Sequence, residues 1–456
     1  MKKQYVFVVL CVSVGWCSAF QLITDNQFQT GVIAKDPDTG VAEGSIQYTT
    51  ANGSPDWDLA QWNSQSSIYG SSSVPLSSGA YKWQNLYKVL VMGPTNTVDS
   101  DLKLTVNSIS EYAGVYRQSG DPWPHLLVSQ RISEPNGKVG TASPWISELT
   151  ELNYNLDAKL CYANNVYSTG YNSSLHAAQF LNFFTVQNLN SSSPDYGNYL
   201  WFGVRIYDDR KALPGLSVQQ DLGTGKLIYN IGIEPFCTNG LVVGEWKNIS
   251  GDILPYVKDA LETAWDLGYL TNSINFTDYK IGGMNMGWEV PGLSCVTMQI
   301  SNFGLDAYGL YFPKPYEFLT DGDREGWTVS NLTDTNDGPL TGTWVLNASA
   351  NDPKLIGPEI LVDTELYPKV KVKMANAGNP AAASVAQLFW KCSGDTGFSE
   401  AQSKKVNIGN GGGWVEYTFD MTGDLDWHDE IIQLRVDPIY YGDGHAIGID
   451  YIRFSE

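Results

Sequence analysis

Hydrophobic and polar positions alternate over short stretches along most of this chain, and such alternation predicts β-strands. Clusters of Gly, Asn, Asp and Ser separate the stretches, as turns between strands require. Short strands at this spacing are typical of sandwiches and jelly rolls. The clearest candidates are residues 102–106, 125–132, 200–207, 296–300, 370–374, 414–419 and 431–436. We therefore predict an all-β protein.

One segment departs from this pattern. Residues 252–270 carry Val257, Leu261, Ala264 and Trp265 at helical spacing, and Gly268 follows as a stop signal. The pattern predicts one amphipathic helix packed on the outside of a sandwich.

The strand expected at residues 282–291 has two different faces, because side chains alternate along a strand. Met284, Met286, Trp288 and Val290 form a core face. The opposite face carries Gly283, Asn285, Gly287 and Glu289. A face that glycine leaves almost bare suits a sheet against which a ligand lies. Glu289 is therefore the first candidate for catalysis and Asn285 a candidate ligand-binding group, although a covered strand with a solvated carboxylate explains the pattern equally well.

The strand expected at residues 200–209 repeats this logic. Its second face would carry Trp201, Gly203, Arg205, Tyr207 and Asp209. In this order they supply a stacking ring, a gap, a cation, a phenol and a carboxylate. This set resembles the lining of a groove, in which Trp201 would bind substrate.

His125 and His176 are the only histidines before residue 313, and Gln179 follows the second of them. His125 and Gln179 are candidate substrate-binding residues. Each histidine is more commonly structural. If they line the groove, a His and Tyr pair near Arg205 would suit a lyase, which needs a base for the proton beside a uronate and a cation for its carboxylate.

The composition favours a neutral ligand. The formal net charge of −21 and the pI near 4.5 oppose nucleic acid and anionic membrane surfaces. Aromatic residues make up 12% of the chain, with 15 Trp and 26 Tyr, and in exported β-proteins such a surplus commonly forms platforms for sugar rings. A polysaccharide is the expected partner, and a monomer is the expected state.

Residues 1–19 have the features of a secretory signal peptide: Lys2 and Lys3, an apolar run, then the small residues Ser18 and Ala19. No later run approaches the roughly 20 apolar residues that span a bilayer. We expect a secreted protein, extracellular or periplasmic. The seven Asn-x-Ser/Thr sequences, at Asn52, Asn172, Asn190, Asn248, Asn275, Asn331 and Asn347, do not decide whether the host glycosylates it.

Four cysteines remain after the leader. One bridge among Cys161, Cys237 and Cys295 is compatible with the sequence, whereas Cys392 is expected to be a buried thiol. A proline-flanked seam at residues 311–316 predicts a first domain at 20–312, a linker at 313–317 and a second domain at 318–456.

The helix, the segment Gly287-Trp288-Glu289-Val290-Pro291-Gly292 and the strand at residues 296–303 together resemble the closing part of jelly-roll endoglucanases of glycoside hydrolase family 12. The match covers residues 252–308 and implies that Glu289 is the general acid/base. The family's nucleophile is a glutamate in a Glu-x-Met-x-Trp pattern, which this chain lacks. Arg205 lies on the strand at the comparable place, so Asp209, Asp208 or Glu234 would have to supply the second carboxyl group of a retaining mechanism.

Nearly all of residues 318–456 resembles the galactose-binding-like modules of exported carbohydrate-active enzymes, on the segments 323–327, 389–390, 432–438 and 448–454. Such modules often hold a structural calcium ion, which prefers several oxygen ligands. The resemblance implies Asp321, Asp323 and Asp450 as ligands. A charged turn and a salt-bridged strand end would explain these residues equally well.

Together these features predict a concanavalin-like or jelly-roll β-sandwich with one external helix, followed by a second, galactose-binding-like β-sandwich. The resemblance implies that this second domain is a carbohydrate-binding module. The leading hypothesis is a glycoside hydrolase with Glu289 as acid/base and with Trp201, Tyr207 and Asn285 placing the sugars. A second is a non-catalytic lectin or adhesin, which the missing nucleophile favours. A third is a polysaccharide lyase that uses His176 or His125 with Tyr207 and Arg205.

Overall fold

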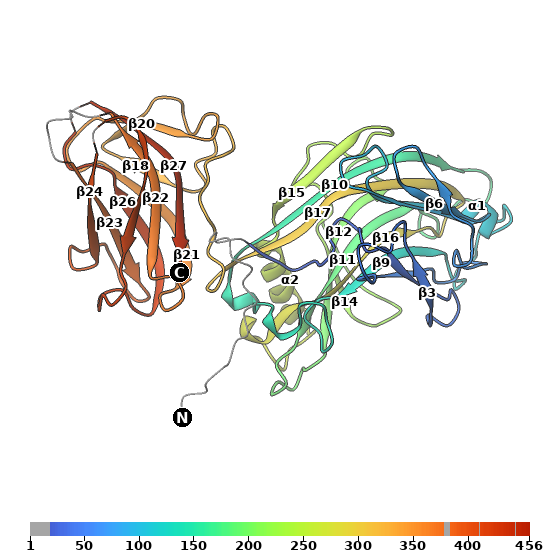
Figure 1. Ribbon diagram of the computed structural model, residues 1–456. Helices are drawn as coiled ribbons and strands as arrows, with labels where there is room; N and C mark the ends of the chain where they lie inside the picture. The colour runs from blue at the N-terminus through green and yellow to red at the C-terminus, as the bar shows by residue number, and fades with distance from the viewer. Residues whose placement is uncertain (1–18, 378–383, 410, 443) are drawn as a thin grey trace. The chain divides into compact units, whose positions relative to one another are not determined.

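A computed structural model describes residues 19–377, 384–409, 411–442 and 444–456. The described chain forms two compact units, one at Phe20–Ala307 and one from Tyr308 to Glu456. Each unit is a β-sandwich (Figure 1), so the predicted all-β fold class is confirmed. The predicted signal peptide lies outside the described residues, except for Ala19.

The first unit is built from two facing sheets. Its nine-stranded sheet has the order β13-β14-β12-β11-β16-β9-β4-β2-β3. The strands are β13 (Ser217–Gln220), β14 (Leu227–Asn230), β12 (Tyr199–Asp208), β11 (Gln179–Asn188), β16 (Tyr279–Glu289), β9 (His125–Arg131), β4 (Trp57–Ala60), β2 (Val32–Lys35) and β3 (Ala42–Ile46).

The second sheet of this unit has eight strands. It has the order β15-β10-β17-β8-β7-β6-β5, with β1 paired to β17. The strands are β15 (Trp246–Asp252), β10 (Leu149–Asn165), β17 (Ser294–Gly309), β8 (Asp101–Asn107), β7 (Lys88–Gly93), β6 (Tyr81–Gln84), β5 (Val74–Pro75) and β1 (Phe20–Gln21).

The core of the first unit lies between its two sheets. Met284, Met286, Trp288 and Val290 are all buried in it, as the alternation along this strand predicts. The indole Nε1 of Trp288 donates a hydrogen bond of 2.9 Å to the carbonyl of Leu104 on β8, in the facing sheet. The core face of β16 is thereby fixed, and its other face points away from the core.

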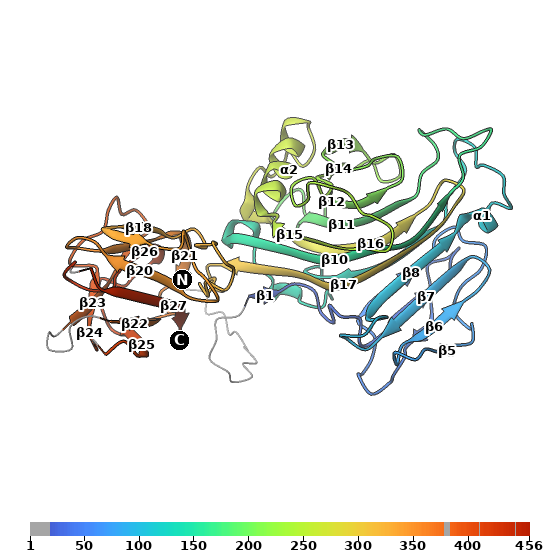
Figure 2. The ribbon, with the colours of Figure 1, turned by 90° about the horizontal axis from the view of Figure 1, so that it is seen from above.

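The predicted helix is α2 (Leu254–Asp266), which lies beside β12 (Figure 2). Asp252 accepts a hydrogen bond of 2.9 Å from the Leu254 amide at its start. Gly268, at φ +85°, follows its end. A further short helix, α1 (Ser108–Glu111), and the single 3₁₀ turns η1 (Gly140–Ala142), η2 (Ile146–Glu148) and η3 (Phe276–Asp278) lie in connections.

The second unit packs two five-stranded sheets around a core that includes Trp327, Trp344 and Trp390. One sheet contains β18 (Thr328–Ser330), β21 (Lys354–Asp363), β26 (Glu430–Asp437), β23 (Ser384–Cys392) and β24 (Ser403–Ile408). The other contains β19 (Leu332–Asp334), β20 (Trp344–Ala348), β27 (Ala446–Ser455), β22 (Lys369–Asn376) and β25 (Trp414–Asp420).

Cys161, Cys237 and Cys295 are free, so none of them forms the bridge that the sequence allowed, and Cys392 is buried as expected. Over the part of the chain that the structure describes, neither helix has the length and apolar character needed to cross a bilayer.

Candidate functional site

Four polar side chains form a line across the face of the nine-stranded sheet that points away from the core, here called the outer face. Asp208 is the Cα partner of Gln179, Gln179 is the partner of Glu289, and Glu289 is the partner of His125. The four residues belong to β12, β11, β16 and β9, at the ends of these strands. We call this line the polar row.

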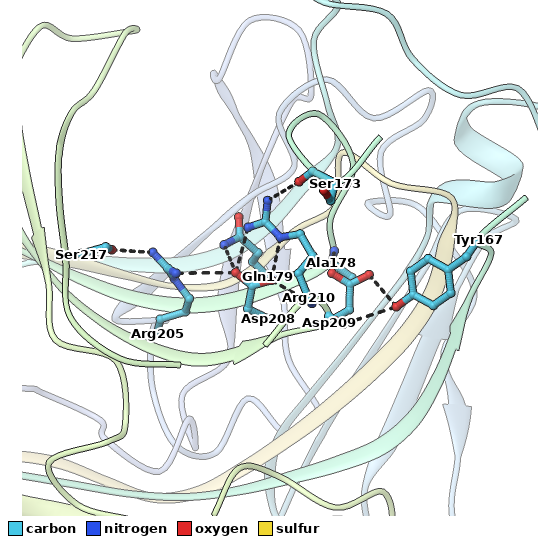
Figure 3. Close-up of polar contacts among 9 residues, drawn as sticks. All are labelled: Tyr167, Ser173, Ala178, Gln179, Arg205, Asp208, Asp209, Arg210 and Ser217. Carbon is cyan, nitrogen blue, oxygen red and sulfur yellow. Dashed lines mark hydrogen bonds and ion pairs between the residues drawn. The ribbon is translucent and has the colours of Figure 1, made fainter. Parts of the chain in front are cut away.

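Gln179 is held on one side by a buried ion pair (Figure 3). Its amide Nε2 donates a hydrogen bond of 2.9 Å to Asp208. Arg210 binds both oxygens of the same carboxylate, each at 2.8 Å, and donates a third hydrogen bond of 2.9 Å to the Ser173 carbonyl. Because Asp208 only accepts hydrogen bonds, it fixes the amino group of Gln179 on its own side.

Asp208 is not a free carboxylate. Its side chain has no exposed surface, and burial opposes its ionisation, but the hydrogen bonds and charge of Arg210 outweigh burial and lower its pKa. A carboxylate held in a bidentate pair is a poor nucleophile and a poor base. Asp208 also lies two strands from Glu289, a separation of about 10 Å between backbones.

Glu289 faces an amide on one side and an imidazole on the other. Its carboxylate lies 3.9 Å from Nε2 of His125, and about a quarter of its side chain, 23%, is exposed. Nδ1 of His125 is buried and makes no hydrogen bond within the described residues. Two indoles flank the imidazole, those of Trp62 and Trp123, each with its ring centroid 5.6 Å away.

A strip of aromatic rings lies further along β11 and β12 on the outer face. The ring centroids of Phe183 and Trp201 are 6.0 Å apart, and those of Trp201 and Tyr199 are 5.1 Å apart. All three side chains are partly exposed. Trp201 thus lies where the sequence places it, on the opposite face from the buried Leu200 and Phe202.

The sequence suggested that glycines leave the outer face almost bare. The structure shows that they do not. A Cβ on Gly203 would lie 2.5 Å from the Phe183 ring and 2.8 Å from the Asn230 amide, so these side chains occupy the space above it. Gly287 has φ +153°, and its Cβ would meet the Leu126 carbonyl at 2.1 Å. These two glycines therefore serve packing within the protein rather than contact with a ligand.

A β-bulge overturns the expected positions at the end of β12. Between Phe180 and Leu181 the register with β12 shifts by one residue, so Tyr207 pairs with Phe180 while Arg205 pairs with Leu181. Tyr207 consequently packs toward the core, with its ring centroid 5.9 Å from that of Trp288, and its hydroxyl accepts a hydrogen bond from Asn165. Asp208 takes the position on the outer face that alternation had given to Tyr207.

Asp209 also points elsewhere. Its carboxylate binds the Ala178 amide and the Tyr167 hydroxyl, on the far side from Asp208 (Figure 3). Burial raises the pKa of Asp209.

Glu234, the third residue considered as a second carboxylate, lies in the loop after β14, beside Gly215. A cavity of about 310 Å³ at the end of β12 is lined by residues 206–212, Pro214 and Leu241.

Arg205 is almost fully buried, and it contacts the first residue of β13. It donates a hydrogen bond of 2.9 Å to Ser217 and lies 3.6 Å from Asp208. This cation does not meet Tyr207, because the bulge turns the two side chains to opposite faces.

His176 is a structural residue. It is 2% exposed, its Nδ1 accepts a hydrogen bond of 2.8 Å from the Asn172 amide, and its Nε2 lies 3.0 Å from the Arg117 carbonyl. An Nδ1 that accepts leaves the proton on Nε2, so neither nitrogen is available as a base. His176 is therefore not available for the predicted lyase. The alternative with His125 lacks its phenol, because Tyr207 packs toward the core and away from Arg205.

The three predicted calcium ligands do not fit a shared ion. Asp321 accepts the Thr341 amide, Asp323 accepts the Glu325 amide, and Asp450 pairs with Lys373 at 2.5 Å. No group of three His, Cys, Asp or Glu side chains suited to a metal occurs among the residues that the structure describes. These contacts favour the alternative of a charged turn and a salt-bridged strand.

Gln179 was a candidate substrate-binding residue from the sequence, but its place beside Glu289 was not predicted. The sequence did contain a signal that Gln179 lies at the position of the family's nucleophile. Gln179, Leu181 and Phe183 keep the spacing of the Glu-x-Met-x-Trp pattern, with an amide in place of the carboxylate. The partner of Glu289 could be assigned only once the pairing of β11 with β16 was known.

No family model and no curated protein matches the sequence. Among solved structures, similar chains include the endoglucanase cel12A from Rhodothermus marinus, with 8% identity over 53% of this chain and 97% of that one and a TM-score of 0.28. A family 12 xyloglucanase from Bacillus licheniformis has 12% identity over 55% and 99%, with a TM-score of 0.29. The low-affinity xylan-binding module CBM86 from Roseburia intestinalis has 14% identity over 31% and 93%, with a TM-score of 0.22. TM-scores this low establish no shared activity.

Proposed function

We propose that the first unit of this exported protein binds a neutral polysaccharide on its outer face and does not hydrolyse it. One observation carries the proposal: the two cross-strand neighbours of Glu289 are Gln179 and His125. Retaining glycosidases need two carboxyl groups about 5 Å apart, which is the separation of side chains on directly paired strand residues. Here an amide and an imidazole occupy both such positions.

The same groups suit binding. Asp208 fixes the Gln179 amino group, so the amide oxygen and the Glu289 carboxylate can both accept hydrogen bonds from sugar hydroxyls. Trp62 beside His125, and the strip of Phe183, Trp201 and Tyr199, provide partly exposed rings on which sugar faces can stack. The net charge of −21 disfavours a polyanionic chain.

An inverting hydrolase is less well supported, although it tolerates a wider separation of its carboxyl groups, about 6.5–9.5 Å. The second carboxylate of such a pair must activate water, and the carboxylate two strands from Glu289 is Asp208, which Arg210 holds on both oxygens. Elimination is also less well supported, because Tyr207 faces the core and His176 is engaged through both ring nitrogens.

The test is affinity electrophoresis of the full chain in gels that contain neutral polysaccharides such as xyloglucan, mixed-linkage glucan or xylan. We expect retention of the natural protein and weaker retention of Glu289→Ala and of Trp201→Ala. Lys82→Ala, on β6 of the other sheet, is the control and should be retained normally. Equal retention of all four proteins would contradict binding on the outer face.

A further inference from the structure

A second, separate feature lies on the second unit, on the sheet that contains β25, β22 and β27 (Figure 2). Trp414 begins β25 and is the Cα partner of Ala375 on β22, which is the partner of Gly448 on β27. The two residues that follow Trp414 in this row, Ala375 and Gly448, are thus the two smallest residue types. Met374 and Ile449, the neighbours of Ala375 and Gly448, are buried, so this row faces away from the core.

The indole of Trp414 lies across these two residues. A Cβ on Gly448 would meet three atoms of the benzo ring, Cη2 at 2.6 Å, Cζ2 at 3.1 Å and Cζ3 at 3.4 Å. The ring therefore reaches over β22 and contacts the backbone of β27. Trp414 is nevertheless 44% exposed. The sheet backbone thus holds the indole in place from below. Its other side remains open to solvent.

Polar groups follow at the next position along the strands. Glu416, Lys373 and Tyr451 are Cα partners, about 7 Å from the row of Trp414. Lys373 also pairs with Asp450 at 2.5 Å, and the Tyr451 hydroxyl donates to Glu416. The side chains of Glu416, Lys373 and Asp450 are 39%, 37% and 26% exposed, so they can bind a ligand on the ring.

We infer that Trp414 and this polar group form a second glycan-binding site, which stacks one pyranose ring of a neutral polysaccharide. A sugar ring has apolar C–H faces and hydroxyls at its rim, which match a single ring bordered by donors and acceptors. The apolar area is one indole with the small residues beside it and the partly buried Val345 of β20, the partner of Gly448, which is too small for the core of a protein interface. Nucleic acid bases also stack on indoles, but the charge of −21 opposes a polyanion.

The inference is independent of the site on the first unit and can fail separately. The full chain is tested by affinity electrophoresis and by titration with soluble neutral polysaccharides. We expect Trp414→Ala to raise the dissociation constant on the order of tenfold, as truncation of a central stacking residue does. The matched control is Trp246→Ala, since Trp246 is 46% exposed on the first unit. It should bind normally.

Gly448→Ala provides the second variant. The new methyl group must displace the indole without removing it, so binding should weaken while the melting temperature changes little. Trp414→Ala in a Trp201→Ala background separates the two sites, because the remaining retention should disappear. Normal binding by both Trp414→Ala and Gly448→Ala would overturn the inference. So would a natural protein that none of the neutral polysaccharides retains.

Discussion

Glu289 on β16 and Gln179 on β11 are direct cross-strand partners on the outer face of the nine-stranded sheet. The pairing places an acid beside an amide, where hydrolysis by retention requires an acid beside a second acid. On the other side of Gln179 is Asp208, which Arg210 binds through both oxygens. Of the two carboxylates in the polar row, Asp208 is held by Arg210 and Glu289 is not. Substitutions in the row should therefore have different effects on binding, catalysis and stability.

Gln179→Glu should convert binding into hydrolysis. The substitution places a second carboxylate at the separation that retention requires, about 5 Å from Glu289. Arg205 and Arg210 offset the added charge next to Asp208. We expect the variant to release reducing ends from a bound polysaccharide. Nuclear magnetic resonance should show that the product keeps the anomeric configuration of the substrate.

The control for this experiment is the double variant Gln179→Glu, Glu289→Gln, which should bind and release no reducing ends. Activity that survives in the double variant would show that another pair of residues does the chemistry.

Asp208→Asn should destabilise the first unit by about 3 kcal/mol, because it leaves the partly buried Arg210 without its ion pair. It should also weaken glycan binding, since Asn keeps only one acceptor oxygen, for which Gln179 and Arg210 then compete. Asp58→Asn is the matched control: its pair with Lys35 is more exposed, and its loss should cost less than about 1 kcal/mol. Urea denaturation of the full chain measures both, and equal losses would argue against the buried pair as a support for Gln179.

Gly287→Ala should destabilise the first unit by about 2–3 kcal/mol. The residue has φ +153°, and a Cβ would lie 2.1 Å from the Leu126 carbonyl, so the backbone of β9 or β16 must move. Gly223→Ala serves as control, because its Cβ would find no atom closer than 3.6 Å. Calorimetry should show a lower melting temperature for the first variant alone. A normal melting temperature with lost binding would instead indicate that a ligand approaches Gly287.

The second unit should lose stability as the pH rises from about 4.5 to 7. Burial raises the pKa of Glu325 to about 7, above its usual 4.5, although both of its oxygens accept backbone hydrogen bonds. The folded state then binds more protons than the unfolded state in this interval, so the stabilisation is complete below pH 4.5 and is lost through pH 7. Glu325→Gln should flatten this dependence, with a difference on the order of 1 kcal/mol between pH 5 and 7. Parallel pH profiles for the two proteins would contradict the assignment.

Local alternation was sufficient for some of these features. The core face of β16 and the helix α2 could be predicted because each depends on one continuous segment with a regular period. Cys392 was likewise predictable as a buried thiol, since the run Leu388-Phe389-Trp390 shortly before it is apolar.

The polar row could not be predicted in this way, because it depends on the register of four strands from distant parts of the sequence. The bulge opposite Leu181 carries no strong local signal, yet it moves Tyr207 to the core and Asp208 to the outer face. His176 was ambiguous for a related reason. Its partners are the backbone of Asn172, four residues away, and that of Arg117 in a separate loop.

The most direct test of the central claim follows reducing ends and binding together on the same neutral polysaccharide, with the natural protein and Glu289→Gln in parallel. We predict that the natural protein is retained by the polysaccharide and releases no reducing ends and no unsaturated products over prolonged incubation. Reducing ends that appear with the natural protein and vanish with Glu289→Gln would contradict the account and establish a hydrolase.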